Sequence, residues 1–526
     1  MYKYSHIKQT KVMKTDKFVS GVSILLLSGI VAKALGAVFR IPLTWVLGID
    51  GLGLYQLIYP VFALLIVLSS SGMPTAVSKL VASKVGAGNY IGAKQVLKVA
   101  CLFFSFVSLV FSIGLFILAE KIASIQGNYL SMWGYRAVAP AIFIVSFLSC
   151  LRGYFQGLSN MVPTALSQII EQGGKLVLGL ALAWAFLPYG VEYATSGALL
   201  GVTLSEIFAT IALWILYLKC PPQNVGARGK FKVVLGELIV VAFPIVVSSV
   251  ILPVLTFVDS FLVVNLLLNS FPVDVSTKLW GVSSGVVTSL INFPIALSLS
   301  VAVSIVPALV GEKIQERVEL MSRAYELIFL FALPAMIFLC VLSESVIISL
   351  YGSSFVLEDK TLLAVRMLCY TAPIVVLGSV LQTQTTSLQA IGLGKLALIS
   401  ILCAGVIKIL LTFWLVAIPE LNIWGFTIAN YAFYIIAVGI DAIYLYKKVG
   451  FCGYFVGSKK IFAGIAMLTL ILLNVNLLVL PSVVKVILGL GIGGVGYLFS
   501  LVVFGLDVRK FNIKLSRINL KSLDKT

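Results

Sequence analysis

The sequence predicts an all-α polytopic membrane protein with about 14 transmembrane helices: two parallel-related six-helix lobes and two extra C-terminal helices. Three observations predict this fold. The 526-residue chain is 60% hydrophobic and 11% charged, with a mean hydropathy of +1.09. Such a balance is typical of a chain whose apolar stretches of about 20 residues cross a bilayer. Basic residues gather in the short segments between these stretches, and one pattern of about six spans occurs twice.

The apolar stretches divide the chain into fourteen expected spans, taken in order with limits good to a few residues. A basic leader, 1–17, precedes them, and a basic tail, 507–526, follows them. The expected spans are 18–46, 53–78, 96–119, 132–156, 163–187, 195–218, 236–266, 281–310, 325–348, 362–388, 395–418, 423–446, 459–479 and 483–506.

The distribution of Lys and Arg predicts the orientation. With the leader inside the cell, the inner segments hold 28 of the 38 Lys and Arg residues and the outer loops hold 4. Cytoplasmic loops carry this excess in membrane proteins, so we expect a multi-pass protein of the cell membrane with both termini cytoplasmic. The net charge of +18 therefore indicates positive-inside loops rather than a nucleic-acid partner.

An internal repeat predicts the lobes. Gln156 and Lys175 correspond to Gln389 and Lys408 at one offset of 233 residues. Pro60 and Pro294, and Pro74 and Pro307, match at the same offset or one residue from it. Because each repeat unit has an even number of spans, about six, the two halves have the same orientation in the membrane. We expect an N-lobe at 18–218, a cytoplasmic linker at 219–235, a C-lobe at 236–446 and two further helices within 459–506.

The first two spans carry the most informative features. A Gly48-Ile49-Asp50-Gly51 turn joins them, and the first holds Lys33 and Arg40 two helical turns apart. An ionisable group at membrane depth costs at least about 2.5–3.5 kcal/mol, so it normally faces a wet interior. The alternative is that these side chains snorkel to the interface. We expect kinks or gating positions at Pro60 and Pro74, with counterparts at Pro294 and Pro307.

Further charges lie within or at the edges of spans. Glu171 and Lys175 are four residues apart, a spacing that favours an ion pair, so either pairing or ligand contact accounts for them. Arg136 and Arg366 fall at outer span ends, where snorkelling is the alternative to a cavity role. Asp259 could be a counter-ion of Arg40 or a coupling-cation site. The other membrane-depth charges are Glu206, Glu326, Lys408 and Asp441.

Signs of bond-making chemistry are few. The single histidine, His6, lies in the polar leader, which disfavours histidine-based catalysis. The chain has no GxxxxGK[ST] phosphate loop, and its seven cysteines form no CxxC pair. We therefore expect no enzyme, no cofactor and no metal.

Three segments carry a family resemblance: RIPLTWVLGIDGLGLYQLIYP, SSSGMPTAVSKLVA and LRGYFQGLSNMVPTALSQIIEQ. They resemble the polysaccharide transporter, or oligosaccharide flippase, branch of the multidrug/oligosaccharidyl-lipid/polysaccharide (MOP) exporter superfamily. Within it they are most similar to stage V sporulation protein B and the Gram-positive lipid II flippase (MurJ-like) group. The resemblance covers nearly the whole chain. It implies two lobes around a central cavity and an alternating-access cycle that moves an undecaprenyl-pyrophosphate-linked sugar from the inner to the outer leaflet.

The resemblance also implies cavity arginines in spans one, two and eight that hold a pyrophosphate. Arg40 matches the first approximately. Span two has no arginine at Tyr59-Pro60, and span eight has Asn292 before Phe293-Pro294. These two departures bear on lipid II as the substrate. They do not affect the implied transport of lipid-linked oligosaccharides. We expect Lys33, Arg136, Lys175 and Arg366 to complete the cationic site.

The sequence thus predicts a flippase for a lipid-linked cell-wall precursor. The expected partners are an undecaprenyl-pyrophosphate-type oligosaccharide, membrane lipids and cell-wall synthesis proteins, with the protein itself a monomer. One alternative is a cation-coupled multidrug exporter of the same superfamily, which would need an acidic, aromatic cavity. Others are a membrane glycosyl- or acyltransferase and a non-transporting scaffold in a sporulation or division complex.

Overall fold

The computed structural model describes residues 2–220, 225–309, 314–352, 360–450 and 458–504. Side chains are described from Ser28 onward, except at positions 30, 33, 34, 37, 300–301, 303–309, 314–316, 360–361 and 458–459. The described residues form helices joined by short turns and contain no strand. They divide into two compact units, each of which is discontinuous in sequence.

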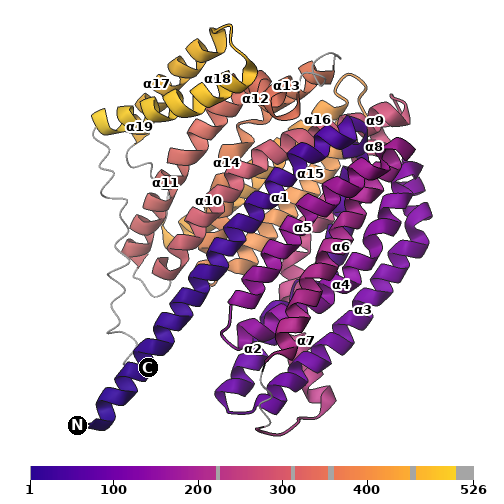
Figure 1. Cartoon of the computed structure of the whole chain (residues 1–526). Coiled ribbons are helices and arrows are strands. Elements are labelled where there is room, and N and C mark those ends of the chain that lie inside the picture. Colours follow the sequence, from indigo (N-terminus) through magenta and orange to yellow (C-terminus); the bar gives the residue numbers. More distant parts are fainter. Residues whose placement is uncertain (1, 221–224, 310–313, 353–359, 451–457, 505–526) are drawn as a thin grey trace. The chain divides into compact units, whose positions relative to one another are not determined.

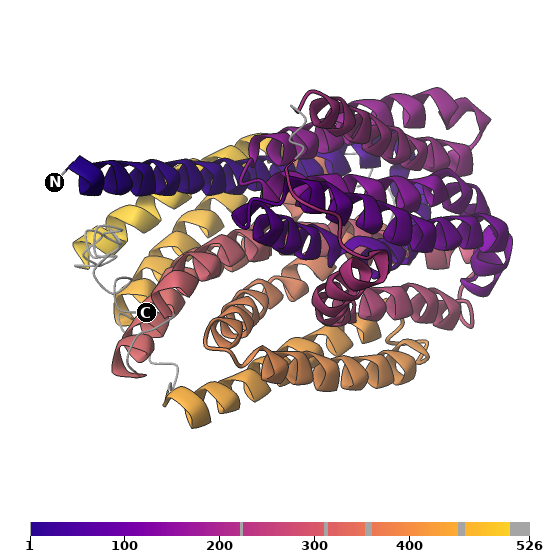
Figure 2. The same cartoon turned by 90° about the horizontal axis from the view of Figure 1, so that it is seen from below.

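Unit 1 comprises the described residues of Met1–Ser289 and Ile401–Phe433. Most of its helices run side by side as a bundle, which Figures 1 and 2 show from two directions (indigo to magenta). Its helices are α1 (Tyr2–Ser70), α2 (Met73–Gly86), α3 (Tyr90–Ile125), α4 (Met132–Gly157), α5 (Val162–Phe186), α6 (Val191–Leu218), α7 (Phe231–Ser249), α8 (Ile251–Leu267) and α9 (Val273–Trp280), with the Ile401–Val416 part of α15 (Gly394–Val416) and the Ile423–Phe433 part of α16 (Ile423–Val449).

Unit 2 comprises the described residues of Leu290–Ser400 and Tyr434–Thr526. In it α17 lies against α11 and α19, and α12 lies against α18. Its helices are α10 (Thr288–Leu309) from Leu290 onward, α11 (Ile314–Val341), α12 (Ser343–Tyr351), α13 (Lys360–Thr371), α14 (Ile374–Ala390), α17 (Ser458–Leu477), α18 (Ser482–Leu488) and α19 (Gly494–Val503), with the remaining parts of α15 and α16.

The helices confirm the predicted fold class and make this a multi-pass membrane protein. Within the described ranges, 12 helices are long and apolar enough to cross a membrane, or 13 when the bent pair α13 and α14 is taken as one span. The expectation of about 14 differs because α1 continues through the predicted turn, so Val38–Gly86 counts as one candidate. The predicted lobes 18–218 and 236–446 stay a prediction.

Two expected spans are interrupted. The expected span 236–266 consists of α7 and α8, with Pro244 inside α7 and Pro253 in the first turn of α8. A proline supplies no backbone N–H and clashes with the preceding turn, which accounts for a break between them. The expected span 362–388 bends by 42° between α13 and α14, where Pro373 lies.

Helix α4 is central to the core of unit 1. It packs against α3, α6, α2 and α1, and its side chains Tyr135 and Phe155 are fully buried. The Tyr135 hydroxyl donates to the side-chain oxygen of Gln126 and to the carbonyl oxygen of Leu57 at 3.2 Å. Because this hydroxyl is satisfied, a tyrosine can lie among apolar residues at little cost.

Helix α1 changes direction at Gly48. This residue has φ 64° and ψ −171°, whereas the residues on both sides are helical. Only glycine adopts such angles readily, because a Cβ atom would clash with the neighbouring peptide groups. The kink falls at the first residue of the predicted Gly48–Gly51 turn, whereas Ile49–Gly51 continue the helix. The position of the break is thus confirmed, but a separate four-residue turn is not.

We expect Gly48→Ala to lower the free energy of unfolding by about 1–3 kcal/mol, the usual cost of forcing a side chain into this backbone region. An added Cβ would meet no atom within 4 Å, so the loss reports backbone strain alone. The thermal unfolding midpoint of the detergent-solubilised protein measures it. Gly114→Ala is the matched control, because Gly114 lies within α3 and is equally uncrowded. Equal midpoints for the two variants would contradict the strain argument.

Candidate functional site

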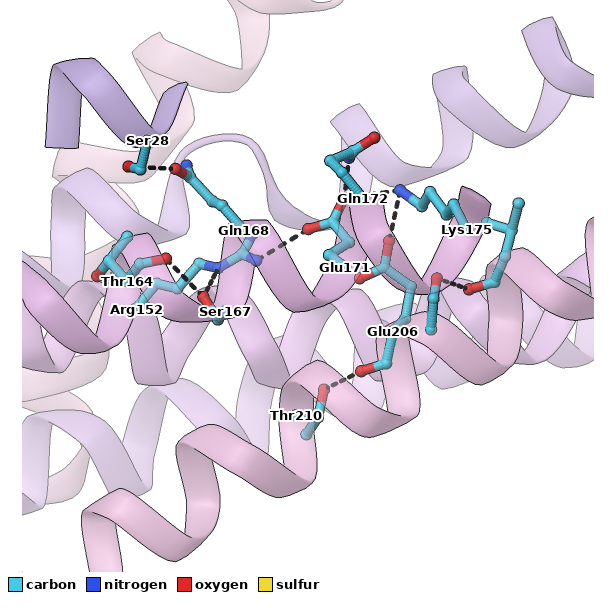
Figure 3. A network of polar contacts seen from close by, with 12 residues as sticks. Ser28, Arg152, Thr164, Ser167, Gln168, Glu171, Gln172, Lys175, Glu206 and Thr210 are labelled. Carbon is cyan, nitrogen blue, oxygen red and sulfur yellow. Dashed lines mark hydrogen bonds and ion pairs between the residues drawn. The ribbon is translucent and has the colours of Figure 1, made fainter. Parts of the chain in front are cut away.

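One face of α5 carries a row of polar side chains. Gln168, Glu171, Gln172 and Lys175 follow the i, i+3, i+4, i+7 spacing that places residues on one face of a helix. All four are partly buried. Figure 3 shows them with Arg152 of α4 and Glu206 of α6, which reach the same place from the two neighbouring helices. We call Arg152, Glu171, Lys175 and Glu206 the α4–α5–α6 network.

Glu171 is the centre of this network. Its Oε2 accepts a hydrogen bond from Arg152 Nη2 at 2.8 Å, and its Oε1 accepts from Lys175 Nζ at 2.6 Å. Gln172 also donates to Oε1, at 2.7 Å, and Ser167 accepts from Arg152 Nε at 2.9 Å. The predicted pair of Glu171 and Lys175 is therefore confirmed, and Arg152 is an additional partner. Both carboxylate oxygens of Glu171 are satisfied by charged donors, the strongest kind of hydrogen bond.

Lys175 has a second carboxylate partner. Its Nζ lies 3.0 Å from Oε1 of Glu206, which is 3% exposed. Glycines bring the two helices together here: a Cβ on Gly174 would lie 2.7 Å from that of Ser205, and one on Gly201 would overlap the backbone of Gly179. Small residues at such crossings let membrane helices approach closely. Since the backbones are so close, Lys175 and Glu206 can meet without extending toward water.

The charges of the network cancel. Arg152 and Lys175 supply two positive charges, and Glu171 and Glu206 supply two negative charges when ionised. Glu206 Oε2 is buried and has no hydrogen-bond partner among the described atoms. Neutralisation at short range is what makes charged groups tolerable at membrane depth. Lys175 therefore is not a free cation in this state, although the sequence analysis expected it in a cationic site.

Arg40 of α1 is in a different situation. It is half-buried, and its Nη1 donates to the Ser289 hydroxyl at 2.5 Å. Among the described residues it forms no ion pair. Further along α1, Ser28 donates to Gln168 at 3.2 Å, which links α1 to the polar face of α5. Lys33 lies between Ser28 and Arg40 in the sequence, and its side chain is outside the described residues.

Asp259 pairs with a cation from the second half of the chain. Its Oδ2 lies 2.5 Å from Nζ of Lys408, and both side chains are buried. Lys408 is the repeat counterpart of Lys175, so the corresponding lysines of the two predicted halves both contact buried carboxylates. The sequence predicts Arg40 or a coupling cation as the partner of Asp259, whereas the partner in the structure is Lys408, which is distant in sequence.

Two other expected site residues, Arg136 and Arg366, lie on α4 and α13. Arg136 lies in the first turns of α4. Its guanidinium is 5.4 Å from the ring centre of Trp133 and 5.9 Å from the ring centre of Phe116. Its buried Nε has no hydrogen-bond partner among the described atoms. Arg366 is exposed on α13.

The four prolines occupy different positions in their helices. Pro60 lies inside α1, Pro74 in the first turn of α2 and Pro294 inside α10, whereas the side chain of Pro307 is outside the described residues.

A pocket of about 290 Å³ lies elsewhere in unit 1. None of the expected site residues lines it, and its lining residues are Tyr90, Lys94, Tyr154, Leu158, Tyr217, Leu218 and Cys220. The described residues contain no group of three or more His, Cys, Asp or Glu that could hold a metal ion.

Three members of these ion pairs are not among the predicted site residues: Arg152, Glu206 and Lys408. Arg152 was counted with the cytoplasmic basic residues, although it stands in the LRGYFQG segment that carries the family resemblance. Glu206 and Lys408 were recognised as charges at membrane depth, but their spacing alone could not reveal their partners.

Comparisons with known proteins agree with the family indicated by the sequence motifs. Residues 18–310 match the family described as polysaccharide biosynthesis protein. Stage V sporulation protein B of Bacillus subtilis (strain 168) is 28% identical over 428 residues, which are 79% of this chain and 81% of that protein.

Two solved structures share the fold. Lipid II flippase MurJ, in an inward closed conformation, matches with a TM-score of 0.71 and 17% identity over 92% of this chain and 99% of that one. A multidrug resistance MATE family transporter of the MOP superfamily, in an inward-facing conformation, matches with a TM-score of 0.62 and 17% identity over 82% and 98%. The predicted resemblance is thereby confirmed.

We expect Glu171→Gln to lower the free energy of unfolding by about 2–3 kcal/mol, because Arg152 loses its carboxylate partner and Lys175 loses one of two. Thermal unfolding in detergent measures the change. The control is Glu319→Gln on α11, whose 2.5 Å pair with Arg323 has the i,i+4 spacing but is exposed, at 65% and 61%. That control should change stability by no more than about 0.5 kcal/mol. A comparable loss in both variants would mean that burial of the network does not matter.

Proposed function

Because the chain belongs to the polysaccharide biosynthesis protein family, we propose that it is a flippase for a lipid-linked cell-wall precursor. The substrate is an undecaprenyl-pyrophosphate-linked saccharide, either lipid II or a related lipid-linked oligosaccharide. The protein moves it from the inner to the outer leaflet by alternating access. It performs no bond-making chemistry and uses no cofactor in this role.

The observation that carries this proposal is the state of Arg40. It is an arginine at membrane depth, half-buried, whose guanidinium contacts one hydroxyl and, within the described residues, no carboxylate. A charged group in this position is costly unless a counter-charge arrives. A pyrophosphate supplies that counter-charge, and a guanidinium binds phosphate through two parallel hydrogen bonds.

Other cations supplement Arg40 in the proposal. The unpartnered Nε of Arg136 and the exposed guanidinium of Arg366 are available to an anionic ligand, and Lys33 completes the set. Lys175 joins them only if the substrate displaces Glu171 or Glu206 from its ammonium. Asp259 and Glu171 act as counter-ions that keep their lysines neutralised between transport cycles.

The helix breaks supply positions for movement. A short break at Ser71-Gly72 separates α1 from α2, and Pro74 lies just after it. Prolines inside or beside spans weaken the local hydrogen-bond ladder, so these positions bend more readily than the rest of a helix. We assign gating to Pro60 and Pro74 and to their counterparts Pro294 and Pro307.

A multidrug exporter is the second candidate, supported by the shared fold of the MATE family transporter. A cationic drug needs an acidic group that is free to bind it. Within the described chain, however, Glu171, Glu206 and Asp259 are already in ion pairs with lysines. The buried carboxylate of Asp441 accepts hydrogen bonds from Ser400 and Thr385. This pairing favours an anionic substrate. A glycosyl- or acyltransferase would instead need a reactive acid or histidine at one membrane face.

The proposal includes an orientation and partners. Both termini are cytoplasmic, as the excess of Lys and Arg in the inner segments predicts. The protein works as a monomer in the cell membrane, in contact with membrane lipids and with the proteins that supply or use the precursor.

The direct test is replacement of a depleted lipid II flippase, read as the fraction of lipid II that becomes accessible at the outer leaflet. Restored exposure of lipid II supports the proposal and identifies the substrate. No restoration, with the protein present in the membrane, overturns lipid II as the substrate. The same assay with other undecaprenyl-pyrophosphate-linked glycans then decides whether the flippase function itself stands.

For the substrate that this test identifies, we expect Arg40→Glu to reduce translocation at least about tenfold, since one charge-assisted hydrogen bond contributes roughly 1.5–3 kcal/mol. Arg40→Lys should lose less, because it keeps the charge but not the two-pronged geometry. Arg323→Glu, an exposed charge reversal on α11, is the control and should transport normally. Membrane levels of all variants are compared by immunoblot. Normal transport by Arg40→Glu would remove Arg40 from the site.

A further inference from the structure

The ion pair of Asp259 and Lys408 has features that a simple surface pair lacks. The two residues lie on α8 and α15, 149 positions apart in the chain, with an Oδ2–Nζ distance of 2.5 Å. Asp259 is 3% exposed and Lys408 is 7% exposed. Both groups are thus largely removed from water, and each neutralises the other.

Packing holds the lysine ammonium in place. Its Nζ lies 5.2 Å from the ring centre of Phe426 and 5.9 Å from that of Phe433, both on α16. Aromatic faces attract a cation, but they provide no hydrogen-bond acceptor. Gly405, one turn before Lys408, allows α15 to approach Leu255 of α8, because a Cβ at this position would lie 2.7 Å from the leucine side chain.

Two buried oxygens, one on α8 and one on α15, have no hydrogen-bond partner among the described atoms. Oδ1 of Asp259 is buried and accepts no hydrogen bond from any described atom, and the same holds for Oγ1 of Thr412. Thr412 lies one turn after Lys408 on the same face of α15. Buried polar oxygens normally have partners, and unpaired ones call for an explanation. Carboxylate and hydroxyl oxygens are the ligands that hard cations prefer.

We propose that Lys408 is a built-in cation at a carboxylate that would otherwise bind a monovalent metal ion. The ammonium, tethered to α15, supplies at Asp259 the single positive charge that a sodium ion would supply. Wild-type protein then requires no Na⁺ at this position. Removing the lysine side chain leaves the carboxylate of Asp259 buried, with space beside it. Na⁺ then binds to this carboxylate. For the flippase proposed above, on which this consequence rests, transport is independent of Na⁺ at Asp259.

Thermal unfolding of the full-length protein in detergent, without substrate, tests the proposal. Na⁺ is titrated against choline at constant ionic strength. We expect the unfolding midpoint of the wild type to be the same in both salts, whereas that of Lys408→Ala rises with Na⁺, saturably and by about 2 °C or more, because ligand binding to the folded state stabilises it.

Two further variants test whether the Na⁺ dependence of the unfolding midpoint arises at Asp259. Asp259→Asn in the Lys408→Ala background should abolish the Na⁺ dependence, because the carboxylate that binds the ion is gone. Lys448→Ala is the matched control: Lys448 is an exposed lysine near the end of α16, and its removal should create no response.

Several outcomes overturn the proposal. A Na⁺-dependent midpoint in the wild type that Asp259→Asn removes would make Asp259 a metal site already, with Lys408 merely nearby. A Na⁺-independent midpoint in Lys408→Ala would leave the pair a structural contact between α8 and α15. If Lys408→Ala is not recovered, Lys408→Gln is tested by the same criterion. Failure to recover either variant at any Na⁺ concentration also overturns the proposal, since Na⁺ must replace the lost ammonium.

This experiment is independent of the flippase assay. A Na⁺ response in Lys408→Ala together with no translocation of any lipid-linked glycan would overturn the proposed function alone. Restored lipid II exposure with no Na⁺ response in Lys408→Ala would overturn this inference alone.

Discussion

A charge inside a bilayer is costly unless it is neutralised where it lies, and this cost organises the ion pairs of unit 1. Glu171 holds Arg152 and Lys175, and Lys175 in turn reaches Glu206. These contacts require α4, α5 and α6 to be in fixed register, and the glycines of α5 and α6 provide the close approach. The close approach of the helices thus places the charged groups within hydrogen-bond distance, and the ion pairs in turn add to the stability of the packing.

The charges of unit 1 are of two kinds: those paired with carboxylates and those with no counter-ion among the described residues. Lys175 and Lys408, which correspond in the internal repeat, are both bound to carboxylates, and such pairs fix helices in place. Arg40 contacts a hydroxyl instead. A transporter for an anion benefits from this division, because a cation with no permanent counter-ion pays less to bind a ligand than one that has to break a buried pair.

Whether a feature can be predicted from the sequence depends on how far apart along the chain the residues that form it lie. Apolar length and the break at Gly48 are local properties, and the Glu171–Lys175 pair follows from helical periodicity, so the sequence predicts all three. Arg152, Glu206 and Lys408 meet their partners only through tertiary packing, which no spacing rule reports. The interruption between α7 and α8 was also missed, because hydropathy averages over a short break and the prolines on either side were not weighed.

The separation of paired residues along the chain has a consequence for assembly during synthesis. Glu171 and Lys175 lie on one helix, so α5 can leave the insertion machinery with these two charges already neutralised. Asp259 and Lys408 are 149 residues apart, so α8 is made long before its counter-ion exists. A charge at a helix centre disfavours insertion by about 2.5–3.5 kcal/mol. Helix α8 therefore has to be retained by its neighbours, or enter with a protonated aspartic acid, until α15 arrives with Lys408.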